Sequence, residues 1–133
     1  MDFVLDASAC ACWAFVDEDH PAAARALLLA ESGTIVVPRL WWFEIRNVLI
    51  VNERRKRLTE TDTHSFLRWL DAFGITVDHT PNEATVFRLA RQYALTVCDS
   101  AYLELAVRLG LNLATLDARL AGAARREGIP LVA

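Results

Sequence analysis

The 133-residue chain has no uninterrupted apolar stretch near the roughly 20 residues that a membrane-spanning helix needs. Its first residues enter strand-like sequence at once and lack the basic flank and long apolar core of a secretory signal peptide. We therefore expect a cytoplasmic protein that is not associated with a membrane. Because 54% of the residues are nevertheless hydrophobic, we expect a single domain over residues 1–133 whose surplus apolar surface lies in a subunit interface.

Cysteine is scarce, and the common catalytic and nucleotide-binding motifs are missing. The three cysteines cannot all pair internally, and Cys10 and Cys12 lie two apart on a predicted helix, where such neighbours face away from each other. We interpret them as buried apolar side chains, because neither they nor the three histidines show metal-ligand spacing. No Ser/His/Asp or Cys/His triad is visible, and the glycine-rich dinucleotide and P-loop fingerprints are absent.

Short apolar or β-branched runs alternate with helical patterns along the chain. We expect strands at 2–6, 34–37, 75–78, 111–115 and 130–132, and helices at 8–16, 21–30, 40–56, 60–73, 81–94, 99–110 and 118–127. Strands that are separated by helices and apolar on both faces indicate a parallel sheet covered on each side. The sequence therefore predicts an α/β fold with about five strands in the order 3-2-1-4-5 and helices on both faces of the sheet.

Two helix starts carry capping signals. Thr59 with Asp62 three residues later resembles a capping box. In the segment 80–83, Thr80 is expected to cap a helix whose first position is Pro81 and whose third is Glu83.

Four acidic residues stand next to the end of a predicted strand or on the apolar face of a predicted helix: Asp6, Glu44, Asp99 and Asp117. A carboxylate withdrawn from water is costly unless a cation meets it. In a sheet of the predicted order, the strands before Asp6 and Asp117 are neighbours whose carboxyl ends open a crevice. Carboxylates gathered there predict a site for a hard divalent cation such as Mg²⁺ or Mn²⁺, which commonly supports phosphate chemistry.

Each acid also has an alternative interpretation in which it stabilises the fold and binds no metal. Asp6 and Asp117 each precede a helix and are candidate helix caps. Glu44 is a candidate ion-pair partner of an arginine at 39 or 46, and Asp99 is a candidate first-turn acid favoured by the helix dipole. By contrast, Glu104 is expected at the surface, paired with Arg108 four residues on.

The charge balance of the remaining residues is mildly basic. The net charge is −3, but setting aside the four acids leaves 13 acidic against 14 basic residues, and of those 14 only Lys56 is a lysine. The planar arginine fork suits phosphate contact, although genomic composition bias explains the arginine preference equally well. Among the aromatic residues 41–43, we expect Trp41 in the core and Trp42 or Phe43 on a partner surface.

Four segments together resemble the acidic motifs of PIN-domain ribonucleases. They are Asp6-Ala7-Ser8 after the first strand, Glu44 in the helix after the second strand, the stretch from Cys98 to Ala106 that contains Asp-x-x-Tyr-Leu-x-Leu-Ala, and Thr115-Leu116-Asp117. In its length and in the sequence of the Asp-x-x-Tyr-Leu-x-Leu-Ala motif, the chain is most similar to VapC-type toxins of bacterial toxin–antitoxin pairs. The resemblance spans nearly the whole chain.

The resemblance implies a PIN-like three-layer fold and a Mg²⁺- or Mn²⁺-dependent endoribonuclease. It also implies RNA as substrate, inhibition by a cognate antitoxin, and a homodimer. By position, Asp6 and Asp99 are the principal metal ligands, Glu44 acts directly or through water, and Asp117 completes the cluster. Ser8 and Thr115 match the polar positions that support it. The candidate phosphate-binding residues are Arg46, Arg54, Arg55 and Arg119, and the last of these stands where some relatives carry a further acid.

Two rival functions use some of the same features. A Mg²⁺-dependent phosphatase or phosphotransfer domain also carries acids at strand ends, but a receiver needs a lysine near the phosphoryl site, and Lys56 is poorly placed for that. A non-catalytic PIN-like binding module is the other alternative, against which the presence of all four acids speaks.

Overall fold

The computed structural model describes residues 1–15 and 17–133. Its centre is a four-stranded, all-parallel sheet in the order β3-β2-β1-β4, which confirms the predicted α/β class. The strands are β1 (Phe3–Leu5), β2 (Ile35–Pro38), β3 (Thr76–Asp78) and β4 (Asn112–Ala114). Residues Phe3, Val4 and Leu5 are fully buried, since β1 lies inside the sheet and is covered on both faces.

The predicted fifth strand at 130–132 is wrong in detail. The segment touches the sheet through one parallel bridge between Leu131 and Leu113, flanked by backbone hydrogen bonds from Leu113 to Pro130 and from Val132 to Leu113. Pro130 has no backbone N–H to donate, so the ladder does not extend beyond this bridge.

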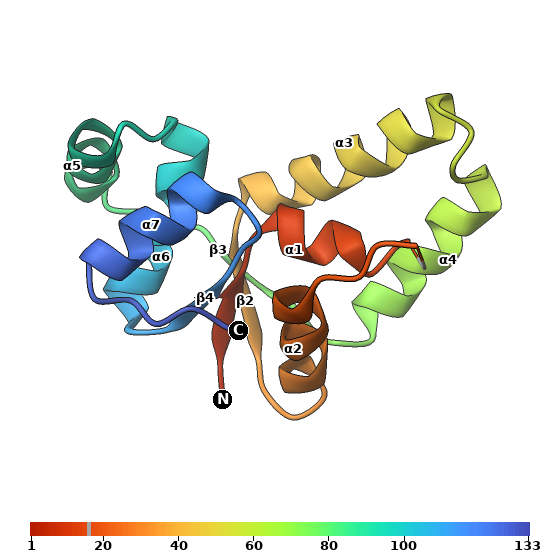
Figure 1. Ribbon diagram of the computed structural model, residues 1–133, viewed down its shortest axis with the longest axis horizontal. Helices are drawn as coiled ribbons and strands as arrows, with labels where there is room; N and C mark the ends of the chain where they lie inside the picture. The colour runs from red at the N-terminus through yellow and green to blue at the C-terminus, as the bar shows by residue number, and fades with distance from the viewer. Residues whose placement is uncertain (16) are drawn as a thin grey trace.

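Helices lie on both sides of the strands (Figure 1), with α5, α6 and α7 grouped on one side and α1 to α4 on the other. Their bounds are α1 Ala7–Cys12, α2 Pro21–Ala30, α3 Leu40–Arg54, α4 Glu60–Asp71, α5 Glu83–Tyr93, α6 Val97–Leu109 and α7 Ala118–Arg126. The first helix was expected to run to Val16; it ends at Cys12, and Val16 lies outside the described residues. Within the described ranges, no helix combines the length and apolar character required to cross a membrane.

The two capping predictions have different outcomes. The Thr59–Asp62 capping box is present, with both reciprocal hydrogen bonds formed. The prediction of Thr80 as a cap is wrong, because Asn82 caps α5 by accepting a 3.0 Å hydrogen bond from the Thr85 backbone N–H. The Thr80 side chain instead donates back to Asp78, so it is not available to the helix.

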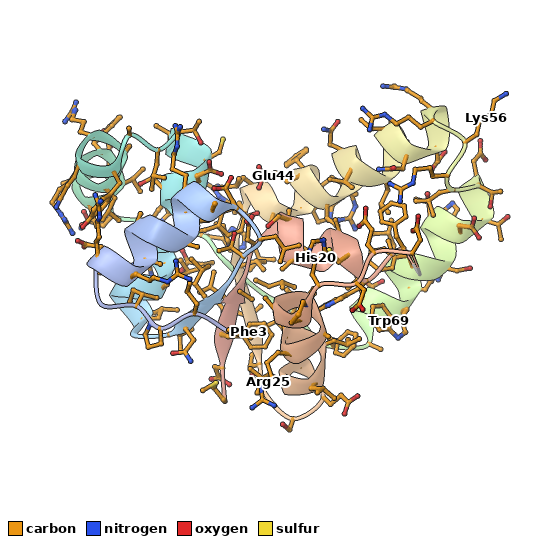
Figure 2. The ribbon with its side chains drawn as sticks, in the orientation of Figure 1. Phe3, His20, Arg25, Glu44, Lys56 and Trp69 are labelled. Atoms are coloured by element: carbon orange, nitrogen blue, oxygen red, sulfur yellow. The ribbon has the colours of Figure 1, made fainter. Side chains whose placement is uncertain are left out.

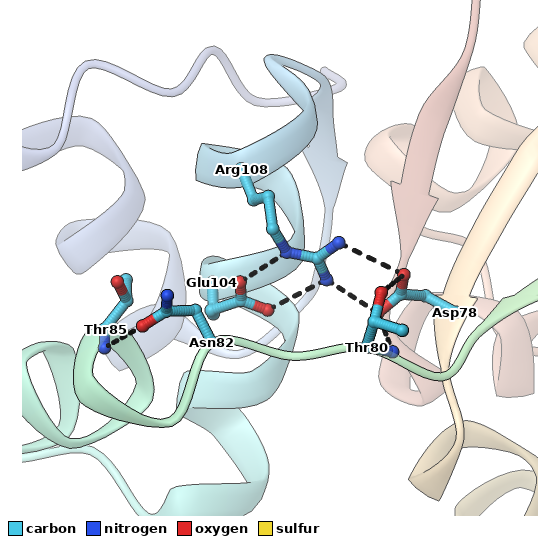
Figure 3. A network of polar contacts seen from close by, with 6 residues as sticks. All are labelled: Asp78, Thr80, Asn82, Thr85, Glu104 and Arg108. Atoms are coloured by element: carbon cyan, nitrogen blue, oxygen red, sulfur yellow. Dashed lines mark hydrogen bonds and ion pairs between the residues drawn. The ribbon is translucent and has the colours of Figure 1, made fainter.

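Glu104 is also placed differently from the prediction. It does pair with Arg108, but only 1% of the residue is exposed, so it is a core acid and not a surface one. Arg108 bridges Glu104 to Asp78 at the end of β3 (Figure 3), with contacts of 2.7 and 2.6 Å. One guanidinium thus neutralises the buried carboxylate of Glu104 and the partly buried carboxylate of Asp78.

All three cysteines are free thiols. Cys10 and Cys12 are buried, as expected, but the expectation of a buried side chain is wrong for Cys98, which is exposed. Burial raises the pKa of the Cys12 thiol to about 11, so it remains protonated and behaves as a small apolar side chain.

Candidate active site

An open depression of about 290 Å³ lies at the carboxyl edge of the sheet. The parallel register brings the ends of β1 and β4 together, and the Asp6 backbone N–H donates to the Ala114 carbonyl at 2.9 Å. Figure 2 shows Glu44 above this edge, on α3. The depression is lined by all four predicted acids together with Ser8 and Asn47: Asp6, Ser8, Glu44, Asn47, Asp99 and Asp117.

Asp6 is the most enclosed of these acids, with 6% of the residue exposed. Its Oδ2 accepts hydrogen bonds from the Ser8 hydroxyl at 2.7 Å and from the Thr115 hydroxyl at 2.6 Å. Burial raises the pKa of the Asp6 carboxyl, the two hydroxyl bonds lower it, and the charge of Asp99 raises it again. Asp6 occupies the N-cap position of α1, but its side chain makes no capping hydrogen bond to the helix.

Ser8 and Thr115 link the two strand ends around Asp6. The Ser8 hydroxyl accepts from the Leu116 backbone N–H and the Thr115 hydroxyl accepts from that of Asp117, each at 3.0 Å. These two hydroxyls therefore connect the backbone after β4 to the carboxylate after β1. The resemblance implies that these two residues support the acidic cluster.

Glu44 reaches the depression from α3. Its Oε1 accepts a 2.6 Å hydrogen bond from the hydroxyl of Tyr102, which is fully buried on α6. Burial raises the pKa of Glu44, the Tyr102 bond lowers it, and the charges of Asp6 and Asp99 raise it further. The alternative partner Arg46 turns away, stacking over the Trp42 ring at 3.8 Å.

Asp99 and Asp117 combine helix-end positions with a place in the depression. Asp99 lies in the first turn of α6, where its backbone N–H donates to the capping hydroxyl of Thr96. Asp117 caps α7, because its Oδ1 accepts from the Leu120 backbone N–H at 2.9 Å. Asp99 is therefore a first-turn acid and Asp117 a helix cap, and both also line the depression.

The charges in the depression are not balanced by basic side chains. In residues 1–15 and 17–133 the ion pairs involve other acids, namely Asp17, Glu18, Asp78, Glu104 and Glu127. Over the same residues no three histidine, cysteine or acidic side chains lie close enough to form a ready-made metal cluster. The all-oxygen donor set fits Mg²⁺ or Mn²⁺, since such ions keep several waters and need only one or two direct carboxylate ligands.

The four candidate phosphate-binding arginines lie outside the lining of the depression. Arg119 donates to the Ala94 carbonyl at the end of α5, and Arg46 donates to the Trp42 carbonyl. Arg54 and Arg55 are exposed at the end of α3.

Sequence reasoning missed two residues of the site. Asn47 follows Glu44 by three residues, so helical spacing alone could have identified it. Tyr102 belongs to the motif that begins at Asp99, but its bond to Glu44 joins positions 58 residues apart. No local pattern in the sequence signals that contact.

The chain, an α/β protein with four acids around a depression at the carboxyl edge of a 3-2-1-4 sheet, matches a known family. The PIN domain family model matches residues 3–126, so the chain belongs to the PIN-domain family. It is 34% identical over 124 residues to Ribonuclease VapC3 of Pyrobaculum aerophilum, covering 91% of this chain and 93% of that protein. The crystal structure of PAE2754 from the same organism shares the fold, with a TM-score of 0.72, 23% identity, and coverage of 92% and 84% of the two chains.

Proposed function

We propose that this chain is a Mg²⁺- or Mn²⁺-dependent endoribonuclease that serves as the toxin of a toxin–antitoxin pair. The observation that carries the proposal is the depression lined by Asp6, Glu44, Asp99 and Asp117, whose lining contains no basic side chain. In it the charge of Asp99 raises the pKa of both Asp6 and Glu44. Like charges collected at one place cost stability, and a bound divalent cation offsets that cost. The relative named as a ribonuclease supports RNA as the substrate.

In this proposal Asp6 and Asp99 are the principal ligands, Glu44 contacts the ion directly or through water, and Asp117 completes the acidic cluster. The bound ion would lower the pKa of a water and neutralise charge on the phosphate oxygens. Ser8 and Thr115 both donate to Oδ2 of Asp6 and thereby orient the carboxylate that would hold the ion. Tyr102 holds Glu44 in the same way from α6.

The remaining parts of the proposal concern substrate, products and partners. Hydrolysis by an activated water would leave 5′-phosphate and 3′-hydroxyl ends. Arg46, Arg54, Arg55 and Arg119 are the candidates for contacts to phosphates away from the cleaved bond. The proposed partners are a cognate antitoxin and a second copy of the chain, and the proposed location is the cytoplasm.

The direct test is cleavage of a labelled RNA in Mn²⁺, in Mg²⁺ and in EDTA. We expect cleavage only with metal, and a loss of at least a hundredfold in Asp99→Asn. The control is Asp19→Asn, which removes an exposed acid distant from the depression and should leave the rate unchanged. Hydrolysis of a small phosphate monoester without RNA cleavage would instead identify a phosphatase, and RNA binding without cleavage would identify a binding module.

A further inference from the structure

A second and larger depression, of about 440 Å³, is lined by other residues of α3 and α6, the two helices that contribute Glu44 and Asp99 to the candidate active site. On α3 it is lined by Phe43, next to Glu44, and on α6 by Ala101, next to Tyr102. The hydrogen bond between Tyr102 and Glu44 joins these two helices. We call this depression the α3–α6 groove; its volume lies in the range of about 300–1,000 Å³ that is usual for ligand pockets.

The groove carries an aromatic side chain that the fold does not bury. Phe43 is 71% exposed, and its ring meets Trp42, itself 47% exposed, edge to face at 4.9 Å. Trp41, the third aromatic residue of this run, is 5% exposed and supplies the core contact at this turn. Core packing therefore accounts for Trp41 but not for Phe43.

Arginines flank these rings. Arg39, the residue before α3, lines the groove together with Phe43, and Arg46 stacks over Trp42. Within the described residues neither arginine is ion-paired with a carboxylate. The two acids that line the groove, Asp78 and Glu104, are already held by Arg108 (Figure 3), so they do not consume the charge of Arg39.

We propose that the α3–α6 groove binds one unpaired base of the RNA, stacked on Phe43, with Arg39 at the neighbouring phosphate. The inference rests on the proposed function, because the strand would continue from the groove into the acidic depression. Exposed rings interleaved with arginines are typical of sites for single-stranded nucleic acid, where every base offers a flat face for stacking. A base inside a duplex has no free face, so the groove would select unpaired RNA.

The test is fluorescence anisotropy of a labelled single-stranded RNA octamer and of a hairpin duplex of equal length, measured in EDTA so that cleavage does not interfere. For Phe43→Ala we expect the single-strand dissociation constant to rise by about 5- to 150-fold, which corresponds to the ~1–3 kcal/mol of one base–aromatic stack. Phe43→Trp should restore the affinity. The matched control is Phe87→Ala, since Phe87 is 39% exposed on α5 and also carries an arginine, Arg91, 5.2 Å from its ring.

Each outcome decides the matter. Equal affinities for wild type and Phe43→Ala, or an equal loss in Phe87→Ala, overturn the proposal. A change in sedimentation of Phe43→Ala with unchanged RNA affinity identifies a protein interface instead. Cleavage, read separately with Mn²⁺, tests the proposed function: a wild type that binds through Phe43 without cutting refutes the nuclease and supports the groove. A wild type that neither binds nor cuts refutes both.

Discussion

The Tyr102 hydroxyl lies 2.6 Å from Oε1 of Glu44 and donates a hydrogen bond to it. This bond crosses from α6 to α3 and makes a buried phenol the neighbour of a carboxylate that lines the acidic depression. Burial and the Glu44 bond both raise the pKa of Tyr102 well above its usual value, so the phenol stays protonated and keeps donating.

We expect Tyr102→Phe to fold but to cleave RNA about 10-fold more slowly than wild type, with the loss in kcat and not in KM. The physical reason is that Glu44 loses the bond that aims it, while the ring that fills the core is kept. The free energy of unfolding should fall by about 1 kcal/mol, a typical net value for one hydrogen bond. Steady-state kinetics measure the change in kcat, and urea unfolding measures the change in stability. An unchanged kcat would show that Tyr102 contributes only to core packing.

Metal binding should stabilise the protein through the predicted ligands. For wild type we expect Mn²⁺ at 100 times its dissociation constant to add about 2.7 kcal/mol to the free energy of unfolding. Asp6→Asn and Asp99→Asn should lose most of that gain. Thermal melts with increasing Mn²⁺ measure it, and equal stabilisation of all three proteins would show that these acids are not ligands.

Without metal, Asp6 and Glu44 in the acidic depression should make the folded protein more stable in mild acid than at neutral pH. The pKa values of Asp6 and Glu44 are raised in the folded state, so folding binds protons between the unfolded and folded pKa values. The contribution of these two groups to stability therefore falls as pH rises through that window. Asp78 and Glu127 have lowered pKa values and act in the opposite sense, because their contribution is lost as pH falls.

Comparison with a variant isolates the effect of Asp6 from these opposing groups. In EDTA at pH 7 we expect Asp6→Asn to be at least as stable as wild type, because its amide oxygen can still accept from Ser8 and Thr115. The difference should shrink as pH is lowered. Thermal melts across pH 4 to 8 test this, and a variant that is less stable than wild type at pH 7 would contradict it.

The Arg108 network should contribute strongly to stability but not to catalysis. Removing the guanidinium in Arg108→Met leaves Glu104, which is 1% exposed, without a cation. We expect a loss of about 3 kcal/mol, as for other broken buried pairs. Arg88→Met, which breaks the more exposed pair with Glu127, is the control and should cost clearly less. If urea unfolding shows that both variants lose the same free energy of unfolding, the Arg108–Glu104 pair contributes little to stability.

Local signals predicted much of the fold because they act within a few residues. The Thr59–Asp62 capping box and the start of α2 at Pro21 lie where the sequence placed them. The cap of α5 was assigned wrongly because Asp78, only two residues earlier, accepts from the Thr80 hydroxyl, and Asn82 caps the helix instead. The fifth strand likewise reduces to one bridge at Leu131 beside β4.

The acids of α3 and α6 show what the sequence predicts and what only the tertiary structure reveals. Helical periodicity gives the direction of each carboxylate on its own helix, but not the group that comes to meet it from another helix. Glu104 was assigned to the surface because Arg108 stands four residues away, yet the core encloses the pair. Glu44 was correctly placed on an inward face, but only the packing of α6 supplies Tyr102.

The sequence by itself determined that this is an α/β chain of the PIN family with four acids in the positions of its motifs. Strand and helix patterns and motif spacing depend on residues that are close together in the sequence, so they can be recognised without the structure. Only the tertiary structure decided which carboxylates lie around one depression and which are neutralised elsewhere. The reason is physical: the pKa of a carboxylate and its need for a cation depend on burial and on charges brought close by packing, and residues distant along the chain supply both.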